Sequence, residues 1–212
     1  MSKKAKKVKK KRKKKDEDIN VDQILLKNRQ LFLFGEINQK QAKPLIREII
    51  ALDKNKHEPI ALFINSPGGC VDAGFAIIDI MKSIQSPIVT VILGEACSMA
   101  GLVSIAGDAR LMSKHSTYMQ HEMTAGDYDY VSKIKDRAKF FELEEKKAIN
   151  FLKEHTKLSD KDLERAKIGE LWLNAEQCVE KGIVEHILPQ KRLIIQKDNK
   201  KKIKKNNKKV KK

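Results

Sequence analysis

The sequence predicts an α/β fold with a largely parallel sheet, and three features of the chain support this class. Apolar runs of strand length occur at 29–35, 59–65 and 87–93, and the second is continuous, as in a strand covered on both faces. A segment with helical spacing or a helix-opening turn follows each run. Strands that alternate with helices in this way are typical of a sheet whose parallel strands are connected by helices.

The individual elements follow from hydrophobic periodicity and from turn residues. Pro44 lies within the first turns of the helix expected over 38–54, which therefore is expected to begin nearer to that residue. The expected strands are 29–35, 59–65, 87–93, 110–113, 117–120 and 183–187. The expected helices are 38–54, 71–84, a segment that opens at Ser98, 127–155, 159–166 and 174–181.

Basic residues concentrate at the two ends of the 212-residue chain, whose formal net charge is +17. Residues 3–15 contain 11 Lys and Arg and no acid, and residues 191–212 contain 12 against Asp198 alone. The rest of the chain carries 22 basic and 27 acidic residues and is mildly acidic. We therefore expect disordered basic tails at 1–18 and 191–212, because like charges repel, and one folded domain at 19–190.

The three cysteines, Cys70, Cys97 and Cys178, form no CxxC pair and no His/Cys cluster, so neither a disulfide framework nor a metal site is predicted. They lie in apolar segments and are expected to be reduced core residues, which favours a cytoplasmic protein. No apolar run approaches the length of a transmembrane helix. The lysine-rich start lacks the apolar segment of a secretory signal and the composition of a transit peptide.

Ser98 is the candidate nucleophile. It follows the strand expected at 87–93 and stands among glycine and alanine residues, in the sequence Gly-Glu-Ala-Cys-Ser-Met-Ala-Gly. Small neighbours let a substrate carbonyl and backbone N–H groups approach a serine closely. The helix expected to start here adds unpaired N–H donors and the positive end of its dipole.

A nucleophilic serine needs a base, and an oxyanion needs backbone donors. Of the five histidines, His121 ends the strand expected at 117–120, and strand ends are where α/β folds gather their sites. The alternative is a surface or capping histidine. Gly68 and Gly69 precede a helix start, and Met99 supplies the N–H after the serine. The alternative for the glycines is a tight turn without catalytic use.

Taken in order, these segments resemble the ClpP family, the proteolytic subunits of Clp proteases, which are serine peptidases. The resemblance covers residues 24–188 and misses both basic tails. Its matching segments are 25–29 with 32–37, 63–69, 94–107, 118–121 and 173–184, which read LLKNR, FLFGEI, FINSPGG, GEACSMAGLVSIAG, YMQH and LNAEQCVEKGIV. A single segment is only moderately specific, whereas five in the same order are strong.

The resemblance implies a fold, a set of roles and an assembly. The implied fold is the ClpP/crotonase-like spiral of ββα units, with the helix at 127–155 as a projecting handle. Ser98 would be the nucleophile, His121 the general base, and Gly69 and Met99 the oxyanion donors, with no cofactor and no metal. Two seven-membered rings of identical subunits would stack into a chamber, and an AAA+ Clp ATPase would use ATP to deliver unfolded protein substrates.

The chain departs from the family pattern at the third catalytic position. The family usually has aspartate before the segment that matches 171–175, and this chain has Glu170, whose carboxylate is one methylene farther from the backbone. Glutamate orients the histidine in some serine hydrolases, so Glu170 is the candidate acid. The alternatives are Asp160, Asp162 or no acid at all. Residues 122–126 also differ from the family, which affects the expected substrate groove.

Other functions remain open at this point. The chain could be a catalytically impaired ring subunit with a structural and docking role, although such subunits typically lack the serine or the histidine. A phage prohead-type protease on the same fold has the same triad. A crotonase-type acyl-CoA enzyme needs no catalytic serine, and a Ser/Lys peptidase needs a lysine that no motif here supplies. The basic tails could bind nucleic acid through phosphates, but no aromatic residue interleaves the lysines for base stacking.

Overall fold

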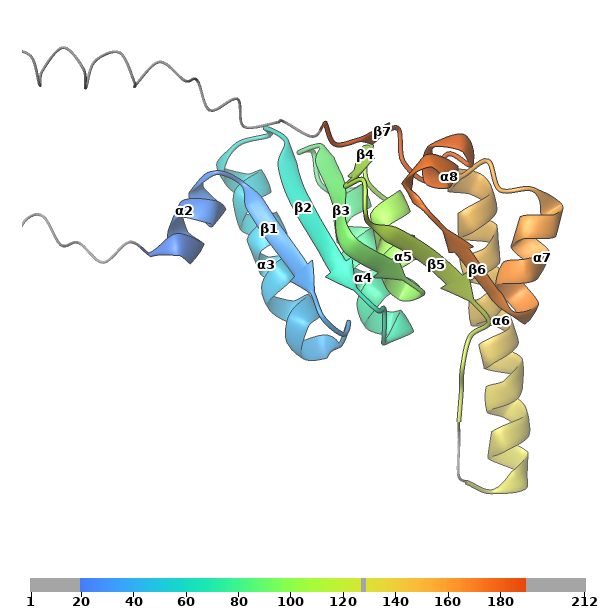
Figure 1. Ribbon diagram of the computed structural model, residues 1–212. Coiled ribbons are helices and arrows are strands. Elements are labelled where there is room, and N and C mark those ends of the chain that lie inside the picture. Colours follow the sequence, from blue (N-terminus) through green and yellow to red (C-terminus); the bar gives the residue numbers. More distant parts are fainter. Residues whose placement is uncertain (1–19, 127–128, 190–212) are drawn as a thin grey trace, which may run out of the picture.

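The computed structural model describes residues 20–126 and 129–189, which form a seven-stranded sheet with helices packed against it (Figure 1). The strand order is β1–β2–β3–β4–β7, and β5 pairs with β3 and β6. All pairs are parallel except β5–β6. The strands are β1 (Gln30–Phe34), β2 (Ile60–Ser66), β3 (Ile88–Cys97), β4 (Ala109–Met112), β5 (Thr117–His121), β6 (Glu170–Leu173) and β7 (His186–Ile187). The predicted α/β class with a largely parallel sheet is confirmed.

The helices pack mainly on one face of this sheet. Figure 1 shows α3, α4 and α5 on that face. α6 extends well beyond the sheet, and α7 lies beside the C-terminal half of α6. The expected handle helix is therefore present. The helices are α2 (Val21–Lys27), α3 (Gln39–Asn55), α4 (Val71–Ser83), α5 (Met99–Ile105), α6 (Val131–His155), α7 (Asp160–Ile168) and α8 (Ala175–Glu180).

The central strands supply the hydrophobic core. Every second side chain of β2 is buried, and Ile60, Leu62 and Ile64 have almost no exposed surface. They pack in one cluster with residues of the covering helices, such as Ile49 and Ile77. Complete burial of an aliphatic side chain stabilises a fold by about 1.5–3 kcal/mol, so this alternation fixes which face of the sheet the helices cover.

Strand β3 changes its pairing partner along its length. Residues 89–92 pair with β4, whereas residues 95–97 pair with β5. Gly94 lies at the change with φ = 87°, and a side chain there would collide with the Asn65 amide. Asn65 Oδ1 accepts a hydrogen bond from Glu95 N–H at 3.1 Å, and Ser116 Oγ accepts one from Gly94 N–H at 2.9 Å. The Asn65 contact joins the second half of β3 to the end of β2, and the Ser116 contact joins it to the residue just before β5.

Several boundaries differ from those expected from sequence. β6 was not predicted, because a strand of four residues gives a weak pattern and its pairing with β5 joins distant segments. β3 extends to Cys97, beyond the predicted end at residue 93. α3 begins at Gln39, five residues before Pro44, because the Asn38 side chain accepts hydrogen bonds from the first turn. α6 begins at Val131; residues 127–128 of the predicted helix lie outside the described residues, as do the predicted tails.

The expectation that all three cysteines are core residues is wrong for one of them. Cys97 and Cys178 are buried, and all three thiols are free. Cys70 is exposed, because it is the N-cap residue of α4 at the end of the Ser-Pro-Gly-Gly turn. The apolar residues that follow Cys70 in the sequence belong to the buried face of α4. Their burial does not extend to the N-cap position, as the prediction had assumed.

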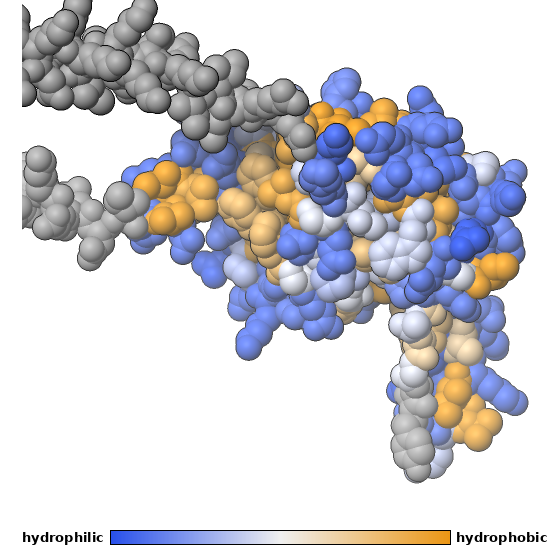
Figure 2. Space-filling view, in the orientation of Figure 1, coloured by the Kyte–Doolittle hydropathy of each residue, from blue (hydrophilic) through white to orange (hydrophobic). Residues whose placement is uncertain are grey.

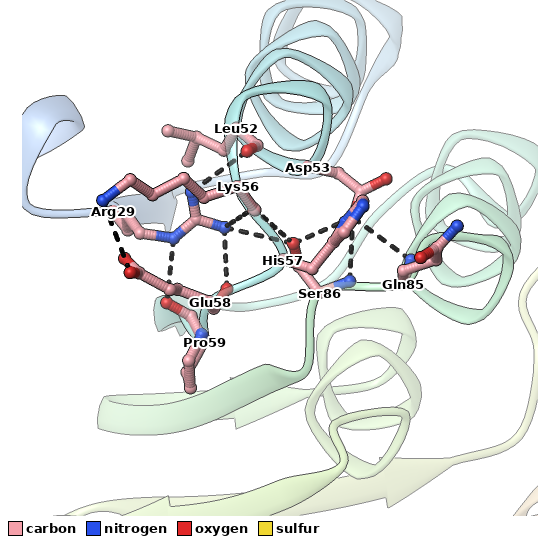
Figure 3. A network of polar contacts seen from close by, with 9 residues as sticks. All are labelled: Arg29, Leu52, Asp53, Lys56, His57, Glu58, Pro59, Gln85 and Ser86. Atoms are coloured by element: carbon pink, nitrogen blue, oxygen red, sulfur yellow. Dashed lines mark hydrogen bonds and ion pairs between the residues drawn. The ribbon is translucent and has the colours of Figure 1, made fainter.

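A buried arginine joins the chain segments next to the start of the sheet (Figure 3). Arg29 has φ = 58° and is only 8% exposed. Its guanidinium donates hydrogen bonds to the carbonyls of Leu52, Lys56, Glu58 and Pro59 and to Ser86 Oγ. A buried guanidinium requires such partners because an unpaired buried charge is costly. The end of α3 is thereby tied to the residues that precede β1, β2 and β3.

Asp53 completes this network from the last turns of α3. Its carboxylate accepts hydrogen bonds from Ser86 N–H at 2.8 Å, Ser86 Oγ at 2.8 Å and Gln85 N–H at 3.1 Å, and it lies 3.1 Å from His57 Nδ1. Partial burial tends to raise the pKa of Asp53, but the hydrogen bonds from Ser86 and the contact with His57 outweigh it and lower the pKa to about 2.

The lowered pKa of Asp53 predicts a specific acid sensitivity. A carboxyl whose pKa is depressed by folding contributes stability above its unfolded pKa of about 3.9, and that contribution is lost as the pH falls towards the folded pKa. We expect the free energy of unfolding of the parent protein to fall from pH 4 to pH 2 more steeply than that of Asp53→Asn, measured by urea unfolding. Asp160→Asn, which removes an exposed carboxylate, should retain the parent slope. Equal slopes for the parent and Asp53→Asn would contradict this assignment.

Candidate active site

Ser98 occupies a sharp turn between β3 and α5. Its φ of 53° and ψ of −125° are unusual for a residue with a side chain, and such strain persists only where surrounding contacts enforce it. Ser98 N–H donates to Met119 O at 2.8 Å, and Ser98 O accepts from Gly101 N–H and from Gln120 Nε2, each at 2.9 Å. The backbone of the candidate nucleophile is thus fixed on both sides.

The turn before α4 packs directly against this serine. Gly68 has φ = 97°, and a Cβ atom there would lie 2.6 Å from Cys97 O and 2.8 Å from Ser98 Cβ. Gly68 O in turn accepts a hydrogen bond from Ile37 N–H at 2.7 Å. Only glycine allows the two backbones to approach this closely, so Gly68 brings the neighbouring Gly69 beside Ser98.

Four of the five predicted site residues line a single pocket. Ser98 and Met99 come from the junction of β3 and α5, Gly69 from the turn before α4, and His121 from the end of β5. The pocket has a volume of about 90 Å³. Its remaining lining residues are Val71, Phe75, Leu102, Gln120, Met123, Thr124, Glu144 and Ala148.

His121 reaches this pocket because β5 runs parallel to the end of β3. Cys97 pairs with Met119, so the strand continues past Ser98 and presents His121 at its end. Within the described residues, neither Ser98 Oγ nor the His121 ring makes a hydrogen bond. Catalytic hydrogen bonds are often long before substrate binds, so the two groups share the pocket without yet forming the serine–base contact.

Glu170 lies opposite His121 in the antiparallel β5–β6 pair. Residues directly opposite in such a pair point to the same face of the sheet. The carboxylate does not line the pocket, however: it accepts a hydrogen bond from Trp172 Nε1 at 2.7 Å, and its side chain is exposed. The backbone of Glu170 therefore lies next to that of His121, whereas the Glu170 carboxylate is hydrogen-bonded to Trp172 and not to the histidine.

The two alternative acids are engaged elsewhere. Asp162 belongs to the capping box of α7 with Ser159 and forms an ion pair with Lys181 at 2.7 Å. The Asp160 side chain is 96% exposed and lies 4.0 Å from Lys153. Neither is paired with the strand that carries His121, so the geometry favours Glu170 among the three.

Two contributions to the pocket were not predicted from sequence. Gln120 is buried and donates from Nε2 to Ser98 O and, at 3.1 Å, to Tyr118 Oη, which links β5 to the serine turn. The alternation of side chains along β5 indicates that Gln120 points inwards with Tyr118. It does not indicate which groups Gln120 hydrogen-bonds. Glu144 and Ala148 come from α6. Ala148 belongs to the apolar face that the sequence predicts for this helix, whereas no pattern indicates that Glu144 lines the pocket.

No group of three or more His, Cys, Asp or Glu residues within 20–126 and 129–189 could hold a metal ion. No helix in these same ranges combines the length and apolar character needed to cross a membrane.

Comparison with known proteins agrees with this geometry. A family model described as Clp protease matches residues 12–191. The chain belongs to the Clp protease family. It is 30% identical over 175 residues to an ATP-dependent Clp protease proteolytic subunit 2 of Treponema denticola, covering 81% of this chain and 88% of that protein. It is 29% identical over 169 residues to the protein of the same name in Treponema pallidum, covering 78% and 85%. The expected Clp protease resemblance and fold are confirmed.

The close approach at Gly68 can be tested by adding one methyl group. We expect Gly68→Ala to lower the free energy of unfolding by about 2–4 kcal/mol, from overpacking against Ser98 and from backbone strain at positive φ. Urea unfolding measures the change. Gly126→Ala is a matched control, because a Cβ atom at Gly126 meets nothing within 4 Å. If both variants unfold at the parent's urea concentration, the packing of the turn is not as described.

Proposed function

We propose that the chain is a Clp-type serine endopeptidase that cleaves peptide bonds with Ser98 and His121. The observation that carries the proposal is the shared pocket. A serine in a strained strand-to-helix turn, a histidine, the first residue of α5 and a glycine of the turn before α4 all line it. Serine peptidases on unrelated folds use the same combination. Membership of the Clp protease family supports this reading.

In the proposed reaction, Ser98 Oγ attacks the substrate carbonyl carbon while a His121 ring nitrogen takes its proton. The negative charge on the carbonyl oxygen is stabilised by two backbone N–H groups. One belongs to Gly69, in the turn before α4, and the other to Met99, the first residue of α5, whose N–H has no partner within the helix. His121 then gives the proton to the leaving amine. Water, deprotonated by His121, hydrolyses the acyl-serine ester and restores the serine.

Glu170 is proposed to orient His121 during this cycle. Its position opposite His121 supports the role, but its carboxylate must first leave Trp172 Nε1. Because Glu170 is exposed, that hydrogen bond competes with water and costs little to break. Substrate binding or subunit contact would supply the change of side-chain conformation.

We further propose that the subunits form two stacked seven-membered rings and receive unfolded proteins from an AAA+ Clp ATPase in the cytoplasm. The names of the relatives include ATP dependence. Exposed apolar residues support assembly, because large apolar patches on soluble domains usually mark interaction sites. Figure 2 shows them over α2 and on the projecting part of α6. They include Val21, Ile24, Tyr130, Val131, Ile134, Phe140 and Leu143.

A second candidate function is a catalytically impaired ring subunit. The hydrogen bond between Trp172 and Glu170 favours it, because this bond keeps the acid away from His121. Assembly into a ring without cleavage of short unstructured peptides would support this candidate over the peptidase. A phage prohead-type protease has no separate observation in its favour.

The nucleophile is tested by peptide cleavage with particle mass measured in the same samples. We expect Ser98→Ala and His121→Ala each to reduce kcat by about 10³-fold or more, since loss of a triad member leaves only binding and oxyanion stabilisation. Parent protein should react with a fluorophosphonate probe and Ser98→Ala should not. Equal labelling of the two proteins would rule out Ser98 as the nucleophile.

The acid is tested by a pair of substitutions at Glu170. We expect Glu170→Gln to lower kcat by about 10²- to 10⁴-fold, because an amide cannot stabilise the imidazolium, while Glu170→Asp retains a carboxylate and most of the activity. Trp172→Phe removes the competing donor and should leave cleavage equal to or faster than the parent. Full activity of Glu170→Gln would show that this residue has no part in catalysis.

A further inference from the structure

The pocket beside Ser98 has one wall that the proposed reaction does not use. α6 supplies this wall through Glu144 and Ala148, which lie one helical turn apart. Around them the lining is apolar or neutral, with Phe75 and Met123 among its members. Among the described residues that line the pocket, Glu144 is the one carboxylate. A carboxylate in an otherwise apolar pocket needs a positive partner, because leaving it desolvated and unpaired is costly.

The surroundings of Glu144 already hold an ammonium group. The Glu144 side chain is 17% exposed, and Lys147 Nζ lies 3.6 Å from its Oε2 atom. The same Nζ atom lies 3.7 Å from the centre of the Phe75 ring. A carboxylate and an aromatic face together are a combination that attracts a cationic side chain. Because the Lys147 side chain is itself 50% exposed, its ion pair is weak and replaceable.

We propose that Glu144 is a specificity-determining residue that favours Lys or Arg on the substrate residue whose carbonyl Ser98 attacks. The inference rests on the proposed peptidase function. The methylene stem of a basic side chain would pack along the apolar wall, and its charged end would pair with Glu144, as long basic side chains do at partly apolar surfaces. An acidic side chain would be repelled, and leucine would leave the carboxylate without a substrate partner.

Lys147 opposes this preference, because it partly neutralises Glu144. Removing Glu144 and removing Lys147 therefore have opposite effects on the substrate preference. Loss of Glu144 abolishes the preference for basic substrates, while loss of Lys147 strengthens it. A structural role for Glu144 in α6 alone would affect all substrates equally and would not produce this pair of effects.

The test compares peptides that differ only at the residue before the scissile bond: Lys, Gln, Leu or Glu in identical flanks. We expect the parent to cleave the Lys peptide with a kcat/KM about tenfold above that for the Gln peptide, a typical ratio for one pocket interaction. Glu144→Gln should remove this ratio, so that the Lys and Gln peptides are cleaved with equal kcat/KM, and should raise the kcat/KM for the Leu peptide relative to that for the Lys peptide. Lys147→Gln should increase the ratio, and added salt should reduce it.

Two further variants separate charge from folding. Glu142→Gln makes the same chemical change at an exposed position of α6 that does not line the pocket, and it should match the parent. Glu144→Lys should turn the preference towards the Glu peptide, which a misfolded protein would not do. If the parent cleaves Leu and Lys peptides alike and Glu144→Gln changes nothing, this inference is wrong and the proposed function stands. If the parent cleaves no peptide, the proposed function fails and this inference with it.

Discussion

The change of partner within β3 is the constraint on which the candidate site depends. On one edge β3 pairs with β4 until Ile92 and with β5 from Glu95, while its other edge stays paired with β2. This second pairing puts Ser98 beside Met119 and therefore beside the end of the strand that carries His121. A straight β3 paired with β4 throughout would leave the serine turn without β5. The positive φ of Gly94, the Gly94 N–H bond to Ser116 Oγ and the Glu95 N–H bond to Asn65 Oδ1 therefore influence the position of Ser98 without contacting it.

Stability and chemistry are placed at opposite ends of the central strands. The Arg29–Asp53–Ser86 network fastens the segments where β1, β2 and β3 begin. The pocket lies where β3 and β5 end, at the carboxyl end of parallel strands, the usual place for sites in α/β folds. Strained geometry at Ser98 is tolerated because well-packed strands and a satisfied buried guanidinium hold the rest of the sheet. Substitutions in the network should therefore affect folding more than the shape of the pocket.

Local patterns in the sequence were enough to predict the central strands and the helices between them. They also indicated Ser98 and His121 as candidate site residues, and both line one pocket. Apolar runs and glycine turns carry their information within a few residues. The missing parts depend on contacts between distant segments. β6 forms because its backbone pairs with β5, which is about 50 residues earlier in the chain. The Glu170 side chain accepts a hydrogen bond from Trp172, and no sequence motif specifies this donor. Glu144 enters the pocket through the docking of a long helix, which periodicity alone leaves undetermined.

The exposure of Cys70 provides a site for attaching a label next to the pocket. Burial raises the pKa of the Cys97 thiol and that of the Cys178 thiol to about 12, so both remain protonated and shielded at neutral pH. Cys70 is exposed and adjoins Gly69 at the pocket. A thiol-reactive fluorophore would therefore attach to one position without any engineered cysteine. Its emission would follow the arrival of peptides beside Ser98 in the unmodified sequence, independently of turnover.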